Sequence, residues 1–182
     1  MKREFAPERL DVAGFAEAGA RLSAEDALNR YVRLAAEAAE PTSSDVVAWD
    51  AVGEERHDAA GRAEPWLHLS AHATLPLVCQ RCLAPVQTRI EVDRWFRFAP
   101  DEDAAAALDE ESEEDVLVVS RDFDLHGLIE DELLMELPIT PRHEVCPQDV
   151  PLSVADPDFE AAQEKRANPF AALAKLRSGK PQ

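Results

Sequence analysis

Hydrophobic and polar residues alternate most regularly between Trp66 and Val78. Six apolar residues share one face of this stretch: Leu67, Leu69, Ala71, Ala73, Leu75 and Leu77. The other face carries Trp66, His68, Ser70, His72 and Thr74. A period of two residues is typical of a β-strand with one buried face. We therefore expect a long strand over residues 66–78 whose leucine and alanine face is turned toward a core.

A second stretch with the same period follows at residues 86–98. Its inward face carries Val86, Thr88, Ile90, Val92, Phe96 and Phe98. The connection between the two stretches, Cys79–Pro85, is short, which favours an antiparallel hairpin. Residues 45–52 alternate in the same way, and residues 116–119 are apolar enough for one more short strand.

Helical signals flank these strands. Asp124 precedes an apolar stripe that consists of Leu125, Leu128, Ile129 and Leu133. This pattern predicts a helix over residues 124–137 that Asp124 caps and Pro138 ends. Ser23, with Asp26 three residues later, resembles a capping box and predicts a helix from Ser23 to Pro41. The alanine-rich residues 8–20 predict another short helix.

The pattern as a whole predicts an α+β fold. We expect an antiparallel β-sheet of about four strands with helices packed on one face. The predicted core consists of Leu67, Leu69, Leu75, Ile90, Val92, Phe96 and Leu128.

Outside this core the composition changes twice. Residues 101–115 contain nine acids and no base, which predicts a flexible acidic loop. From Lys165 onward there are five bases and no acid, and Asn168 followed by Pro169 predicts a short C-terminal helix. We therefore expect an N-terminal helical segment over residues 1–40, a core over 41–157 and a basic tail over 158–182.

Charge narrows the range of partners. The 182 residues include 19 Lys and Arg against 37 Asp and Glu, for a net charge of −18. Such a field repels nucleic acid at long range, because phosphate binding depends on Lys and Arg. The acidic surface either only keeps the protein soluble or binds a basic partner such as a ribosomal protein. The chain has neither an apolar run of about 18 residues nor a signal peptide, so a cytoplasmic location is expected.

Three stretches carry a resemblance to a known family. They are Leu77–Val86, which includes Cys79-Gln80-Arg81-Cys82, then Asp124–Pro141, and finally Asn168–Leu176. In order and approximate separation they resemble the YceD family, also called DUF177. The resemblance implies a ribosome-biogenesis factor that supports the synthesis, processing or stability of large-subunit ribosomal RNA. It implies no catalytic residues, and its implied partners are the large-subunit precursor, its RNA or a basic ribosomal protein.

The cysteines suggest a metal site. Cys79 and Cys82 have the spacing of half a tetrahedral zinc site, and His143 and Cys146 repeat that spacing with one imidazole and one thiol. If the two halves meet, they form a Cys₃His zinc site, with His126 or solvent as the substitute for His143. The alternative is that all three cysteines are reduced thiols without metal.

Other candidates for chemistry are weaker. His68 and His72 lie about 13 Å apart on one strand, which is too far for one metal ion. The basic tail could contact RNA phosphate, or its helix could dock on its own domain through Phe170, Leu173 and Leu176.

A small zinc- or cysteine-dependent hydrolase or redox enzyme is the rival function. It would need an open metal position or an activated nucleophile, and four protein ligands to zinc leave no open position.

Overall fold

The computed structural model describes residues 4–42, 44–58, 60–149 and 154 of the 182-residue chain. The chain divides into two compact units, Met1–Cys146 and Pro147–Gln182. All helices and strands of the described residues belong to the first unit. The predicted tail helix at residues 168–176 lies outside the described residues. Among those residues, no helix combines the length and apolarity that crossing a membrane requires.

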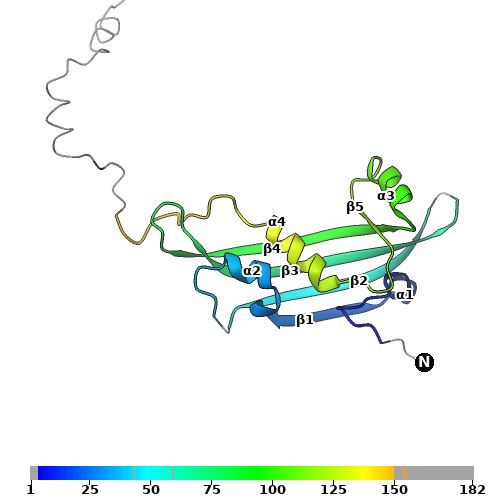
Figure 1. The fold of residues 1–182 in the computed structure, drawn as a ribbon, viewed down its shortest axis with the longest axis horizontal. Helices are drawn as coiled ribbons and strands as arrows, with labels where there is room; N and C mark the ends of the chain where they lie inside the picture. The colour runs from blue at the N-terminus through cyan, green and yellow to red at the C-terminus, as the bar shows by residue number, and fades with distance from the viewer. Residues whose placement is uncertain (1–3, 43, 59, 150–153, 155–182) are drawn as a thin grey trace, which may run out of the picture. The chain divides into compact units, whose positions relative to one another are not determined.

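The first unit is built on a five-stranded sheet (Figure 1). The strands are β1 (Arg21–Ala27), β2 (Val46–His57), β3 (Ala63–Val78), β4 (Pro85–Ala99) and β5 (Asp115–Val118). Their order across the sheet is their order in the chain. The first four pair in antiparallel fashion, whereas the short β5 runs parallel to β4. The predicted strands at 45–52, 66–78, 86–98 and 116–119 and the α+β class are thus confirmed, but the sheet has five strands rather than about four and is mixed rather than antiparallel throughout.

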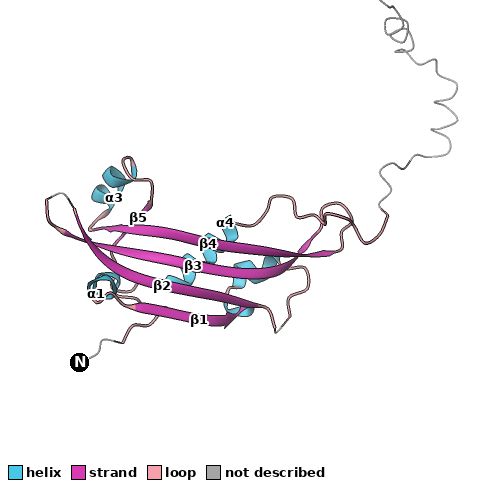
Figure 2. Cartoon of the chain, turned by 180° about the vertical axis from the view of Figure 1, so that it is seen from behind, coloured by secondary structure: helices cyan, strands magenta, loops and turns pink. Residues whose placement is uncertain are grey.

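The main helices cover one face of this sheet. The helical elements are α1 (Val12–Glu17), the 3₁₀ turn η1 (Leu28–Arg30), α2 (Val32–Glu37), α3 (Glu102–Asp109) and α4 (Leu125–Met135). Figures 1 and 2 view the sheet from its two sides and show α2 and α4 on the same face. No helix of the described residues lies on the opposite face of the central strands (Figure 2).

The predicted core lies between the sheet and these helices. Leu67, Leu69, Leu75, Ile90, Val92 and Phe96 are all buried, as are Leu125, Ile129 and Leu133 from α4. Leu128 is only partly buried and packs against the edge of this core. Asp124 caps α4 as predicted, because its side chain accepts a hydrogen bond from the backbone N–H of Gly127 (3.0 Å).

The prediction of a helix that begins at Ser23 is wrong. Residues 21–27 form β1 at the edge of the sheet, paired with β2 along its whole length. Leu22, Ala24 and Asp26 alternate with exposed residues and face the core side of the sheet. This period of two residues was overlooked because the capping pattern favoured a helix. Pairing with β2 outweighs a local capping signal. The helix there starts only at Val32, while the helix expected within residues 8–20 is α1.

The prediction of a flexible acidic loop over residues 101–115 is also wrong for residues 102–109, which form α3. Asp101 accepts a hydrogen bond from the N–H of Ala104 (2.9 Å) and caps α3, in which Ala105 is buried. Alanine is the best helix former, and acids in the first turn interact favourably with the helix dipole. Residues 110–114 carry no helix or strand, and β5 begins at Asp115.

Candidate metal centre

The turn between β3 and β4 brings two cysteines together. β3 ends at Val78, and Cys79 then donates its backbone N–H to the carbonyl of Ala84 (3.0 Å). Leu83 donates to the carbonyl of Cys79 (2.9 Å) and has a φ of 60°, which few non-glycine residues adopt. These two bonds close a compact turn that contains Cys79 and Cys82.

The segment that follows α4 returns to this turn. Pro138 and Pro141 keep the segment out of a helix, and residues 138–149 contain neither helix nor strand. The backbone N–H of Gln80 donates to the carbonyl of Pro141 (2.8 Å). This bond ties the segment to the cysteine turn just before His143 and Cys146.

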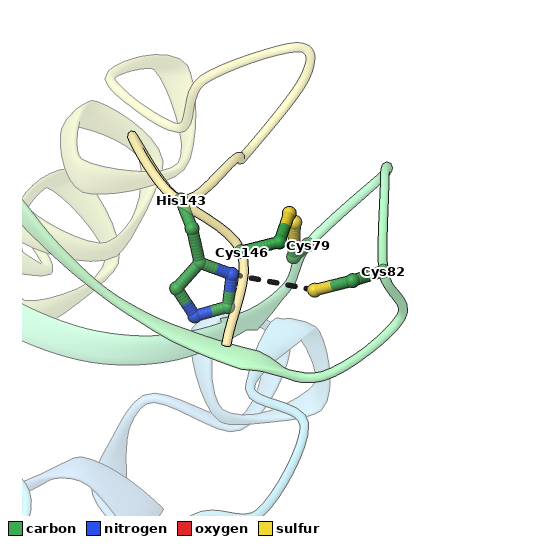
Figure 3. A group of neighbouring side chains, drawn as sticks. All are labelled: Cys79, Cys82, His143 and Cys146. Atoms are coloured by element: carbon green, nitrogen blue, oxygen red, sulfur yellow. Dashed lines mark hydrogen bonds between the residues drawn. The ribbon is translucent and has the colours of Figure 1, made fainter. Parts of the chain in front are cut away.

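The four side chains converge, as Figure 3 shows. The sulfur atoms of Cys79, Cys82 and Cys146 and a ring nitrogen of His143 all lie within 4.8 Å of one another. The Cys82 Sγ is 3.4 Å from the Nδ1 of His143. Cys79 is fully buried, whereas the other three residues are half-buried, and no disulfide joins the three cysteines.

The surroundings favour negative charge on one sulfur. Burial raises the pKa of the Cys79 thiol, but the backbone N–H groups of Cys82, His143 and Arg81 outweigh that effect and lower the pKa to about 5. The pKa of Cys146 is raised, first by burial and then by the neighbouring sulfurs of Cys82 and Cys79. A cation among the sulfurs would relieve this crowding.

The donor set fits a structural zinc ion. Zinc binds Cys sulfur at about 2.3 Å and His nitrogen at about 2.0–2.1 Å in a tetrahedron, so ligands of one ion lie roughly 3.3–3.8 Å apart. Donor atoms within 4.8 Å of one another would need to approach by only about 1 Å. The structure thus brings together all four residues that the sequence singled out, while zinc itself stays a prediction.

Comparison with known proteins places the chain in a family. The model of the family described as "Large ribosomal RNA subunit accumulation protein YceD" matches residues 67–177, which is more than half of the chain. The chain belongs to the YceD family. The YceD match begins within β3 and includes all four residues of the metal centre, whereas β1 and β2 precede it.

One YceD relative gives a measure of the similarity. The Large ribosomal RNA subunit accumulation protein YceD of Haemophilus influenzae is 33% identical over 106 residues, which are 56% of this chain and 59% of the relative. The match thus spans less than two thirds of that relative's length. No solved structure matches the chain.

The other histidines lie outside the centre. His126, the substitute ligand considered from the sequence, is on α4, and its Nε2 is 3.2 Å from a carboxylate oxygen of Asp26. His68 is on β3, with its Nε2 2.8 Å from a carboxylate oxygen of Asp93. Neither belongs to the group of four donors, so the geometry favours His143 as the fourth ligand.

A second feature of this region was not predicted from the sequence. An open hollow of about 620 Å³ lies between the start of β4 and residues 138–144. Arg81, Arg89 and Arg142 line it together with His143 and Glu144, and we call it the arginine hollow. Its signal in the sequence is an absence of acids, because residues 73–90 and 137–143 contain no Asp or Glu.

Proposed function

We propose that this chain supports the accumulation of large-subunit ribosomal RNA and acts by binding rather than by catalysis. The observation that carries the proposal is the YceD match over residues 67–177. The proposed partner is a large-subunit precursor, through its RNA or a basic ribosomal protein, in the cytoplasm. The net charge of −18 complements a basic protein partner.

We further propose that Cys79, Cys82, His143 and Cys146 hold one structural zinc ion. When bound, the ion would fasten residues 138–146 to the hairpin of β3 and β4, next to the Gln80–Pro141 hydrogen bond. Four protein ligands would leave no open coordination position for a substrate. This argues for a scaffold and against a zinc-dependent hydrolase.

Loss of the gene tests the main proposal. In a strain without it, the ratio of large-subunit to small-subunit ribosomal RNA should fall, and a plasmid copy of the wild-type gene should restore the ratio. Tagged protein should co-sediment with large-subunit precursors, and purified protein should leave precursor RNA uncut. If the ratio of large-subunit to small-subunit ribosomal RNA is unchanged in the deletion strain, the proposal is wrong. Cleavage of the precursor RNA by the purified protein would favour the enzymatic alternative.

Metal content tests the zinc proposal. Protein prepared without chelator under reducing conditions should carry about one zinc per chain, and Cys82→Ser and Cys146→Ser should each lose the metal and similar stability. His72→Ala removes an imidazole outside the centre and should keep the metal. If elemental analysis finds no metal in the wild type and all three thiols titrate freely, the zinc proposal is wrong.

A further inference from the structure

We propose that the arginine hollow binds the phosphate backbone of RNA. The inference deepens the proposed function, on which it rests, by naming the part of the chain that contacts the ribosomal RNA precursor. It concerns Arg81, Arg89 and Arg142, and it is independent of the basic tail over residues 165–182.

Two of the three arginines in the hollow have no carboxylate partner among the described residues. Most arginines of the described residues are paired with a carboxylate, as Arg33 is with Glu130 (2.9 Å). Arg81 and Arg142 make no ion pair with any described residue, and both line the hollow. Arg89 pairs with Glu91 (3.0 Å), but both side chains are more than half exposed, so that pair is weak. The hollow therefore offers two guanidinium groups, those of Arg81 and Arg142, that pair with no carboxylate of the described residues.

The side chains that line the hollow carry a net positive charge. Glu144 is the one acid among the lining residues, against three arginines. The chain has 37 acids, yet none lies within residues 73–90 or 137–143, and the Gln80–Pro141 hydrogen bond brings these two acid-free stretches together. Because the Debye length is about 10 Å at 0.1 M salt, acids elsewhere are screened and this local positive charge dominates at contact.

The side chains that line the hollow are of the types that bind phosphate. Guanidinium groups bind phosphate oxygens through two parallel hydrogen bonds. Thr88, Thr140 and Gln87 also line the hollow, and hydroxyl and amide side chains are common contacts to the nucleic-acid backbone. No Phe, Tyr or Trp is among its lining residues, so only His143 and the guanidinium planes could stack on a base. The expected contact is to phosphate and is independent of sequence.

Binding to a labelled RNA tests the inference. Fluorescence anisotropy with a fluorescein-labelled single-stranded RNA should show that the double variant Arg81→Gln, Arg142→Gln binds at least about tenfold more weakly than the wild type. The control is Arg9→Gln, Arg62→Gln, which changes two exposed arginines paired with Asp122 and Asp58. Both double variants lower the net charge by two, from −18 to −20. The control should bind within about twofold of the wild type.

Salt dependence provides a second measurement. If three phosphates are neutralised on a single strand, the slope of log K against log salt concentration should be about −2. In the Arg81→Gln, Arg142→Gln variant it should be flatter. Zinc content and circular dichroism should match the wild type, which separates loss of contact from loss of structure.

Several outcomes would overturn the inference. They are equal loss of affinity in both double variants, unchanged affinity in the hollow variant, or loss only when Lys175, Arg177 and Lys180 of the tail become Gln. Binding of an acidic peptide with no binding of RNA would assign the hollow to a protein partner instead. If deletion of the gene lowers the ribosomal RNA ratio but the hollow variant restores it fully, the proposed function stands and the inference fails. If deletion has no effect, the proposed function fails, and anisotropy still decides whether the hollow binds RNA.

Discussion

At the scale of single residues, Leu69 is a direct test of the sheet's orientation. It lies in the middle of β3 and is completely buried against the helices. Leu69→Ala should lower the free energy of unfolding by about 2–5 kcal/mol, because it leaves a cavity that the packed core fills only in part. Leu83→Ala deletes the same atoms from a side chain that is 74% exposed and should change stability by less than about 0.5 kcal/mol. Equal urea midpoints for the two variants would contradict the assignment of the buried face.

The role of a single residue could be predicted from the sequence where a short local pattern indicates it. The period of two residues identified the buried leucines of β3, and the spacing of Cys79 and Cys82 pointed to two of the four residues that converge in the candidate metal centre. Contacts between distant residues leave no such pattern. A methyl group on Gly53 would lie 2.6 Å from the ring of Phe15, so the close approach of α1 to β2 depends on this glycine. Nothing near Gly53 in the sequence indicates Phe15 as its neighbour.

At the scale of elements, a buried polar cluster joins β1, β2 and α4. Asp26 on β1 accepts hydrogen bonds from the Trp49 indole (2.7 Å) and the Tyr31 hydroxyl (3.0 Å), and the Nε2 of His126 is 3.2 Å away. Burial alone would raise the pKa of Asp26. The hydrogen bonds from Trp49 and Tyr31, with the charges of His126 and Arg30, lower the pKa below its ordinary value. The cluster therefore stabilises the ionised form.

This cluster predicts a pH-dependent contribution to stability. Asp26→Asn should lower the free energy of unfolding at pH 7 by about 1–3 kcal/mol, because the hydrogen bonds to Trp49 and Tyr31 weaken. Since the folded pKa lies below the unfolded value of about 3.8, the advantage of the wild type should be complete above that pH. It should shrink as the pH falls through the folded pKa.

Denaturant unfolding between about pH 2.5 and 8 measures this difference. Asp50→Asn is the control, because Asp50 pairs with Arg21, whose side chain is 69% exposed, on the face of the sheet without helices. That variant should lose less than about 1 kcal/mol. A wild-type advantage over Asp26→Asn that grows as the pH falls would contradict the assignment.

The elements that the sequence mispredicted were those with two competing local signals. Ser23 and Asp26 resemble a helix cap, yet Asp26 is half-buried and accepts a hydrogen bond from Trp49 on the neighbouring strand. The acids after Pro100 suggest a loop, yet four alanines at residues 104–107 allow α3 to form and bury Ala105. In both cases packing against β2 or β4 and β5 decided the outcome. That packing cannot be derived before the sheet is known.

At the scale of the whole molecule, the net charge predicts a response to salt. With 37 acids against 19 bases, repulsion among acids should destabilise the compact state, and salt should screen it. Most of the arginine–carboxylate pairs are exposed, so their weakening by salt should cost little. Raising NaCl from about 0.02 to 0.5 M should therefore raise the thermal midpoint by a few degrees.

A charge-reduced variant provides the comparison. Changing Glu110, Glu111, Glu113 and Glu114 to Gln alters four residues without helix or strand and brings the net charge from −18 to −14. This variant should respond less to salt than the wild type. A thermal midpoint that falls with salt in both proteins would mean that ion pairs outweigh the repulsion.

The distance along the chain between the two halves of the candidate metal centre also determines how long the first half exists alone during synthesis. Cys82 and His143 are 61 residues apart. At about 5–20 residues per second, a ribosome needs roughly 3–12 s to synthesise the stretch between them. For that interval each new chain carries the first two thiols without His143 and Cys146. During synthesis the pair would be open to oxidants and to competing metal ions, because the second half of the candidate centre does not yet exist.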